Sequence, residues 1–330
     1  MESANGDVDI AILVQERDEL KEHCFRLNSE VTEHCEHITR LTADLSRLTA
    51  NLGFAPGHFY SPIVDVSDPV VMQAARAPRP ICDEGGITLD REAMEAFCER
   101  LARHHALFPF GRDPQPGFRF FYGNPAFGAH DAVALFSMLL EYRPRRVVEV
   151  GSGYSSCLLL DTNERFFDRK LELTMIDPAL EEIQTKMPFG DTAGAELIPE
   201  KVQEVPLSVF RKLDANDILF LDSSHVAKTA SDVNHYLFEI LPVIAPGVLV
   251  HIHDIVYPFE YPAEWILEEK RSWNEAYAVR AFLQYNLEFP MLYWTSYAAQ
   301  VFPDKVRALM PMAMENEGGS MWLQRRNPGA

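Results

Sequence analysis

The stretch RVVEVGSGYSS, residues 146–156, decides the fold of this chain. Its first half, Arg146–Val150, is mostly branched apolar residues, which favour a strand buried on both faces of a sheet. Gly151 and Gly153 end the strand, and a helix is predicted from Ser155. Ligands bind at the carboxyl ends of strands in such parallel sheets. A glycine pair by itself also fits an ordinary tight turn. Other parts of the sequence must therefore distinguish a ligand-binding loop from a turn.

The chain around this stretch alternates helices with short apolar strands. We predict helices at residues 129–142, from 155, near 230–241 and at 272–284, the last with a capping box at 272–275, and strands at 146–150, 171–176, 201–205, 218–221 and 248–253. Two late segments, 289–297 and 320–324, are predicted to close the sheet as a pair. This pattern indicates an α/β fold with a mostly parallel, Rossmann-like sheet covered by helices on both faces.

Residues 1–52 carry a heptad repeat. Two mostly apolar series recur every seven residues, with Arg17 and His34 as polar exceptions. One series is Leu13, Leu20, Leu27, His34, Leu41 and Leu48, and the other is Ile10, Arg17, Cys24, Val31, Ile38, Leu45 and Leu52. The first series (heptad position d) is mostly leucine, and the second (position a) has isoleucine, valine or leucine at several places. This pattern favours a parallel two-stranded coiled coil, and so a homodimer. The alternative is a single amphipathic helix packed on its own domain.

The segment 53–120 is rich in proline and glycine, and we interpret it as a linker and cap region. One helix is predicted in it, near Asp90–His105, with Asp90 as the N-cap. The remaining residues, 121–330, form the predicted catalytic domain.

The composition excludes several classes of partner. Forty-nine acidic residues against 30 basic ones give a net charge of -19, which repels nucleic acid and anionic membranes and leaves a small molecule as the expected partner. The N-terminus lacks the pattern of a signal peptide, and no apolar run is long enough to span a bilayer. Five scattered cysteines without a CxxC pair favour a reducing compartment. We therefore expect a cytoplasmic protein.

Spacing around the glycine loop favours one type of cofactor. A dinucleotide fold has G-x-G-x-x-G, but Ser156 stands at the third glycine position. Glu149 precedes the loop, and Asp177 ends the second strand, where a carboxylate can accept both hydroxyls of a ribose. Alternatively, Asp177 is a turn residue before Pro178, and Glu149 is an ion-pair partner for the arginines at 143, 145 and 146.

Together, Glu149-x-Gly151-x-Gly153, Asp177 and the strand 217–222 resemble the ordered motifs of class I S-adenosyl-L-methionine (SAM)-dependent methyltransferases. The resemblance covers roughly residues 120–325 and implies a seven-stranded sheet whose last strand is antiparallel. It further implies that the loop borders the methionine part of SAM, that Asp177 holds the ribose, and that Gln203-Glu204 lie near the adenine. The cofactor-binding residues so predicted are Glu149, Gly151, Ser152, Gly153, Tyr154, Asp177, Gln203 and Asp222.

Histidines and carboxylates end the fourth and fifth predicted strands, in Asp222–His225 and His251–Asp254. The arrangement is similar to that of divalent-metal-dependent small-molecule O-methyltransferases. That resemblance implies Asp222, His253 and Asp254 as ligands of a divalent ion, although His253 stands where the family usually has an oxygen donor. His225 or His253 is the candidate general base. The alternative is that these histidines are structural and bind no metal.

The acceptor is predicted to enter beside this rim. The aromatic segment 257–265 either lines an acceptor pocket or packs a cap onto the sheet, and residues 122–125 could close over the cofactor. The sequence thus favours SAM-dependent O-methylation of a hydroxylated small molecule, a sugar or secondary metabolite. A non-catalytic, methyltransferase-like scaffold acting through its coiled coil is the alternative. A nucleotide-linked oxidoreductase or hydroxylase on the same sheet is disfavoured by Ser156 in place of the third glycine.

Overall fold

The computed structural model describes the chain except for residues 1–2, 51, 82–84, 187–191, 193 and 327–330. The chain divides into two compact units, Met1–Asp65 and Val66–Ala330, and each is described here by itself. Within the described ranges, no helix combines the length and the apolar character needed to cross a membrane.

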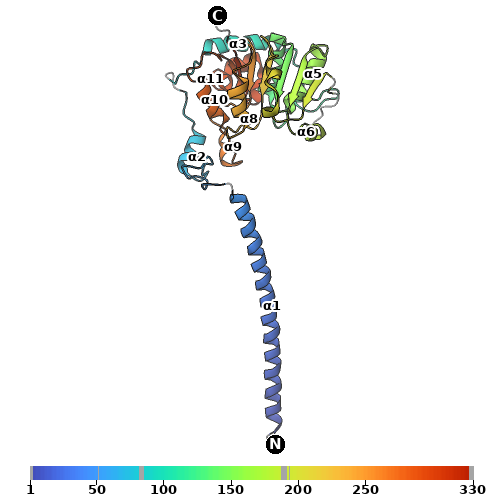
Figure 1. Cartoon of the computed structure of the whole chain (residues 1–330), viewed down its shortest axis with the longest axis vertical. Helices are drawn as coiled ribbons and strands as arrows, with labels where there is room; N and C mark the ends of the chain where they lie inside the picture. The colour runs from blue at the N-terminus through green and yellow to red at the C-terminus, as the bar shows by residue number, and fades with distance from the viewer. Residues whose placement is uncertain (1–2, 51, 82–84, 187–191, 193, 327–330) are drawn as a thin grey trace. The chain divides into compact units, whose positions relative to one another are not determined.

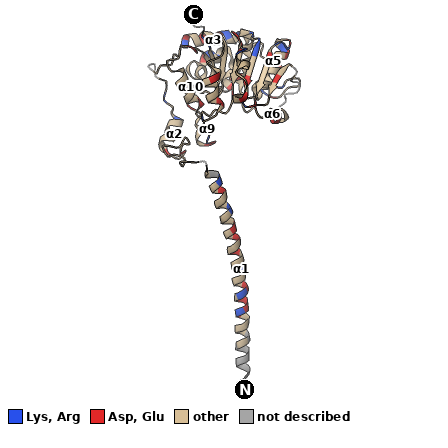
Figure 2. Cartoon of the chain, in the orientation of Figure 1, with Lys and Arg blue, Asp and Glu red and all other residues tan. Residues whose placement is uncertain are grey.

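The N-terminal unit is dominated by one helix, α1, Ser3–Thr49 (Figure 1). The two heptad series of Sequence analysis form the predicted coiled-coil seam of this helix. Its apolar side chains, such as Leu20, Val31 and Ile38, are exposed. Acidic and basic residues are mixed along the helix (Figure 2), and some pair within it, as Arg47 does with Asp44. The predicted helix is confirmed, and its pairing with a second copy stays a prediction.

The second unit begins with two helices: α2, Pro69–Arg76, and α3, Arg91–His105. Asp90 caps α3 as predicted, because its side chain accepts a hydrogen bond from the backbone N–H of Ala93. α3 packs against α4, Ala129–Tyr142, which has the predicted bounds.

The core of the second unit is a seven-stranded sheet in the order β3-β2-β1-β4-β5-β7-β6. Its strands are β1 Arg146–Val150, β2 Glu172–Ile176, β3 Ala195–Ile198, β4 Ile218–Leu221, β5 Leu249–Ile252, β6 Met291–Trp294 and β7 Met321–Gln324. All neighbours from β3 to β5 are parallel, and β7 runs antiparallel to both β5 and β6. The seven-stranded, mostly parallel sheet with an antiparallel last strand is therefore confirmed.

Helices cover both faces of this sheet (Figure 1). After α4 they are α5 Tyr154–Phe166, α6 Leu180–Lys186, α7 Leu207–Phe210, α8 Asp232–His235, α9 Ala263–Leu267, α10 Glu275–Leu283, α11 Thr295–Val301 and α12 Pro303–Leu309. The central strands β4 and β5 are buried along their whole length, as expected for strands covered on two sides.

Three sequence predictions of local structure were wrong. Residues 201–205 are not a strand: Val202–Glu204 form a 3₁₀ turn before Pro206, and the third strand is β3, a partly exposed edge strand with little apolar signal. The helix predicted at 230–241 is the short α8 followed by a π-helical turn, Tyr236–Ile240. The capping box at 272–275 does not form, because the N-cap is Asn274, whose side chain accepts from the N–H of Ala227 instead.

Candidate functional site

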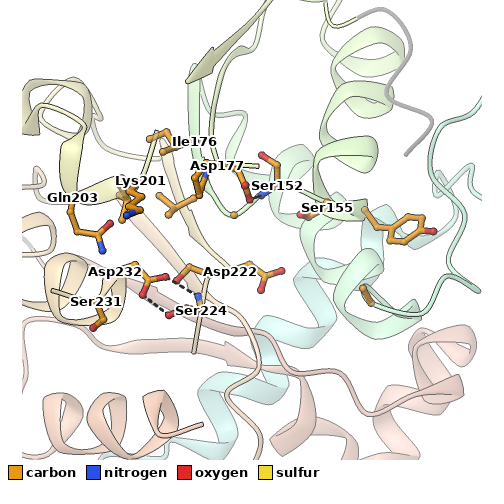
Figure 3. A pocket seen from close by; sticks show the side chains of 18 of the residues that line it. Ser152, Ser155, Ile176, Asp177, Lys201, Gln203, Asp222, Ser224, Ser231 and Asp232 are labelled. Carbon is orange, nitrogen blue, oxygen red and sulfur yellow. Dashed lines mark hydrogen bonds between the residues drawn. The ribbon is translucent and has the colours of Figure 1, made fainter. Parts of the chain in front are cut away.

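A cavity of about 640 Å³ lies at the carboxyl ends of β1, β2 and β4. Figure 3 shows Asp177, Lys201 and Gln203 on one side of it, and Asp222, Ser224 and Asp232 on the other. Seven of the residues predicted to bind the cofactor lie on its wall: Gly151, Ser152, Gly153, Tyr154, Asp177, Gln203 and Asp222. The parallel topology thus brings the glycine loop and two of the three predicted carboxylates, Asp177 and Asp222, to one place.

Gly151 lets the loop pass directly against the end of β4. Its φ is +87°, in the left-handed region, and a Cβ on it would lie 1.5 Å from the carbonyl oxygen of Asp222. Its N–H also donates to the carbonyl of Ile176 on β2. No residue with a side chain can occupy this position without moving the strand end.

Asp177 is fixed by the backbone around it. One carboxylate oxygen accepts from the N–H of Ser152 at 3.0 Å, and the other accepts from the N–H of Ala179 at 2.7 Å. Each oxygen still has a lone pair for another donor, so the carboxylate can accept the hydroxyls of a ribose while it orients the loop. Its position in the cavity wall favours this role over that of a plain turn residue.

Glu149 lies beneath the loop and outside the described cavity wall. Its side chain is buried and accepts hydrogen bonds from the hydroxyls of Ser155, at 2.7 Å, and Ser156. Burial raises the pKa of Glu149 to about 8. Glu149 therefore supports the loop, and its predicted contact with the cofactor stays a prediction. The alternative, an ion pair with the nearby arginines, was wrong, since Arg145 and Arg146 pair with Asp214 and Glu172 instead.

Ser156 has a structural use that a third glycine could not provide. Its hydroxyl accepts from the N–H of Gly153 at 3.0 Å and donates to Glu149. The serine closes the first turn of α5 onto the glycine loop, which explains the departure from the dinucleotide pattern.

Sequence reasoning missed several wall residues of the larger cavity. Asp232, at the start of α8, accepts from both the N–H and the hydroxyl of Ser224, at 2.8 and 2.5 Å, and so shapes the loop after β4. Lys201 and Lys228 also line the cavity. The helix-start pattern Ser231-Asp232 was the available signal, but nothing in it points to the cavity. Glu204, predicted near the adenine with Gln203, lies outside the described wall.

A second cavity, of about 260 Å³, lies beside the first. Ala126 lines both cavities, whereas His253, Asp254 and Trp265 line only the smaller one. Asn124, from the loop expected to close over the cofactor, also lines the smaller cavity, and its side chain bonds the backbone of residues 121 and 127. The loop therefore forms part of the wall between the two spaces.

Asp222 and Asp254 are joined by His225. Nε2 of His225 lies 3.5 Å from an oxygen of each carboxylate. Asp222 faces the larger cavity and Asp254 the smaller, so this cluster lies between them. His225 and Asp254 both have positive φ, +58° and +55°, a conformation that costs of order 1–3 kcal/mol and is concentrated at functional sites.

Glu275 bonds the other ring nitrogen of His225, Nδ1, and the sequence did not reveal this contact. One oxygen of Glu275 lies 2.7 Å from Nδ1 of His225, and the other accepts from the hydroxyl of Tyr236 at 2.6 Å. The carbonyl of His225 accepts from the N–H groups of Asn274 and Glu275. Fifty residues separate Glu275 from His225, and its carboxylate was interpreted as part of a helix cap.

The charges of the two site histidines follow from this arrangement. Burial disfavours a charged His225, but Asp222 and Glu275 outweigh it and raise the pKa of His225 well above its ordinary value. His253 lies with Nε2 3.6 Å from Asp254. Burial also opposes its protonation, yet Asp222 and Asp254 raise the pKa of His253 above 6.5. His251, in contrast, stacks on Phe220 and bonds Ser320, so it is a structural histidine.

The residues expected to hold a divalent ion do not fit one in this arrangement. Nε2 of His225 occupies the space between the carboxylates of Asp222 and Asp254, and the protonated ring supplies the positive charge there. Across the described ranges, no group of three or more His, Cys, Asp or Glu side chains is arranged to hold a metal ion. The predicted ligand set Asp222, His253 and Asp254 is therefore not supported.

Some residues of the aromatic segment 257–265 line a cavity and others pack in the core, so each of its two predicted roles is partly met. Trp265 and Pro262 line the smaller cavity. Phe259 and Tyr261 are buried, and they pack against Trp294 and Trp273 respectively.

Parts of this chain are similar to known proteins. Residues 148–255, which include the glycine loop and both carboxylate clusters, match a family described as a methyltransferase domain. An uncharacterized protein of Archaeoglobus fulgidus is 35% identical over 170 residues, which are 50% of this chain and 76% of that protein. A solved structure titled CmcI-N160 apo-structure covers 85% of this chain and 95% of its own, with 17% identity and a TM-score of 0.38.

Proposed function

We propose that this chain, in which residues 148–255 match a family described as a methyltransferase domain, transfers a methyl group from SAM to a hydroxyl of a small molecule, such as a sugar or secondary metabolite. The observation that carries the proposal is the position of the Asp222–His225–Asp254 cluster between two cavities. One cavity has the cofactor residues on its wall, and the other is a smaller space with an imidazole and a carboxylate.

The larger cavity is the proposed SAM site. Asp177 is placed to accept the ribose hydroxyls, and the Gly151–Gly153 loop offers close backbone approach to the methionine part. Gln203 lies on the same side as Asp177, where the adenine would extend (Figure 3). SAM, when bound, supplies an electrophilic methyl group on a sulfonium, so the chain has to orient the acceptor and take up its proton.

The smaller cavity is the proposed acceptor site, and His253 the proposed base. Nε2 of His253 lies 3.6 Å from Asp254, and both residues line the cavity that would hold the acceptor hydroxyl. Asp254 stabilises the imidazolium that forms when His253 takes the proton. His225 stays protonated and neutralises the paired carboxylates, with Glu275 fixing its ring. No step of this mechanism requires a divalent ion.

The pKa directions predict how the rate depends on pH. His253 must be neutral to accept a proton, and its pKa is raised above 6.5 by Asp222 and Asp254 against the effect of burial. Methyl transfer should therefore rise with pH through the range above 6.5 and level off once His253 is neutral. A pH–rate profile of kcat tests this, and a rate that falls over that range would contradict the assignment.

The reaction is tested by incubating the full chain with SAM and a panel of hydroxylated compounds and measuring S-adenosylhomocysteine and methylated product. His253→Asn should lower kcat by about 10²- to 10⁴-fold, the usual contribution of a general base, and leave SAM affinity unchanged. His105→Asn is the matched control, because His105 lies on neither described cavity wall. An unchanged kcat in His253→Asn would overturn the base, and no turnover by the wild type would overturn the reaction.

A further inference from the structure

The wall of the smaller cavity carries an unbalanced charge. Three carboxylates line it, Asp131, Asp254 and Glu317, and the described wall contains no lysine or arginine. Asp254 lies against His225, and Asp131 is already bonded by the N–H groups of Gly319 and Ser320. Glu317 is exposed and accepts one hydrogen bond, from Gln300. An anion that entered this space would meet three carboxylates, and the imidazole of His253 is the one basic side chain on the described wall.

The same wall is suited to a ring that carries hydroxyls. The carboxylates of Asp254 and Glu317 accept hydrogen bonds, and the indole of Trp265 gives an apolar surface beside them. His253 is only 3% exposed, and its buried Nδ1 has no hydrogen-bond partner among the described residues, so the hydrogen-bonding capacity of this nitrogen is unused there.

The size of the cavity limits the acceptor further. At about 260 Å³ it falls below the range of about 300–1,000 Å³ that holds drug-sized ligands. Glycines at 128, 318 and 319 border it, and a Cβ on Gly319 would lie 3.0 Å from a carboxylate oxygen of Asp254. The glycine side of the wall therefore lies close to Asp254, and the cavity leaves room for one ring.

We infer that the smaller cavity takes a single hydroxylated ring that is uncharged or cationic, and that Glu317 at its exposed side discriminates against anionic acceptors. This inference rests on the proposed function, because it takes the smaller cavity as the acceptor site. It goes further by fixing the charge class of the acceptor and by naming a residue that determines specificity.

Binding of matched probes tests the charge class without requiring turnover. The full chain, saturated with S-adenosylhomocysteine, is titrated with two series of rings while tryptophan fluorescence is followed. One series is methyl glucoside, glucosamine and glucuronic acid, and the other is 4-methylcatechol, dopamine and 3,4-dihydroxybenzoate. In at least one series the neutral and cationic members should bind at least about tenfold more tightly than the anionic member, since like-charge contacts in a binding site cost several kcal/mol. Trp265→Phe should remove the signal.

Variants at the exposed side of the cavity test the specificity residue. Glu317→Gln should reduce the preference for neutral over anionic probes, and Glu317→Lys should reduce it further. Glu315→Gln is the matched control: Glu315 is two residues away, pairs with Arg112 and is not part of the described wall. Equal or tighter binding of the anionic probes by the wild type, binding of no probe, or the same change in Glu315→Gln would overturn the inference. Probe binding without methyl transfer would instead remove the proposed reaction and leave the charge class standing.

Discussion

At the scale of single residues, the carboxylates of this site differ in what they contact: some support the loop and others line the cavity. Glu149 was predicted from its place in the motif, but the side chain points under the loop and bonds Ser155 and Ser156. Asp177 and Asp222 lie on the cavity wall where the motif places them. The sequence could not distinguish these cases, because the strand position of an acid does not say whether its side chain reaches a ligand or a neighbouring helix.

Glu149 predicts a stability that depends on pH. Its ordinary pKa is 4.5 and burial raises it to about 8 in the folded chain, so folding takes up a proton between these values. The contribution of Glu149 to stability is therefore fully present below pH 4.5 and is lost as pH rises through 8. Between pH 5.5 and 8, the free energy of unfolding of Glu149→Gln should rise by about 3 kcal/mol relative to that of the wild type, at about 1.4 kcal/mol per pH unit.

Urea unfolding at the two pH values, followed by tryptophan fluorescence, measures this gain. All four tryptophans belong to the unit Val66–Ala330, so the signal reports the domain that contains Glu149. Glu172→Gln serves as the control, because Glu172 is exposed on β2. If the stabilities of wild type and Glu149→Gln change in parallel with pH, the buried, protonated glutamic acid is refuted.

At the scale of elements, the predictable parts are those with a strong local pattern. The helices at 91–105 and 129–142 and the strands at 146–150 and 218–221 were predicted with bounds that match or nearly match the structure. The third strand was missed because β3 is a four-residue edge strand that includes the exposed Glu196. The link between Glu275 and His225 was missed for a different reason: tertiary packing of α10, not a local pattern, creates it.

The turn between β1 and α5 gives a prediction about two neighbouring glycines. Gly151→Ala combines a positive φ with overlap of the carbonyl of Asp222, so it should lower Tm by at least about 5 °C and weaken SAM binding at least about 100-fold. A Cβ on Gly153 would contact nothing within 4 Å, so Gly153→Ala should leave Tm within about 2 °C. Thermal unfolding of both variants checks this, and equal shifts in Tm would contradict the described geometry of the loop.

At the scale of the whole molecule, α1 is the feature that the catalytic domain does not explain. Its seam of leucine and branched residues, exposed in a helix of 47 residues, matches the pattern of a two-stranded coiled coil. We propose that α1 pairs in parallel with a second copy of this chain. Burial of the seam in a dimer would supply the stability that a single exposed helix lacks.

Removal of residues 1–52 should convert a dimer into a monomer, measured as a halved mass by light scattering at the same concentration. Leu20→Glu with Leu27→Glu should have the same effect, because it places charges in the seam. Glu19→Gln, outside the seam, should leave the mass unchanged. A full-length chain that already has the mass of a monomer would refute the pairing.

The central claim is that the larger cavity binds SAM through Asp177, and calorimetric titration of SAM tests it most directly. The wild type should bind one SAM per chain, and Asp177→Ala should bind it about 10- to 100-fold more weakly, since hydrogen bonds to a charged group contribute about 1.5–3 kcal/mol. Asp304→Ala, which changes an exposed carboxylate outside the described cavity wall, should bind SAM like the wild type. No binding by the wild type, or equal affinity in Asp177→Ala, would contradict the account.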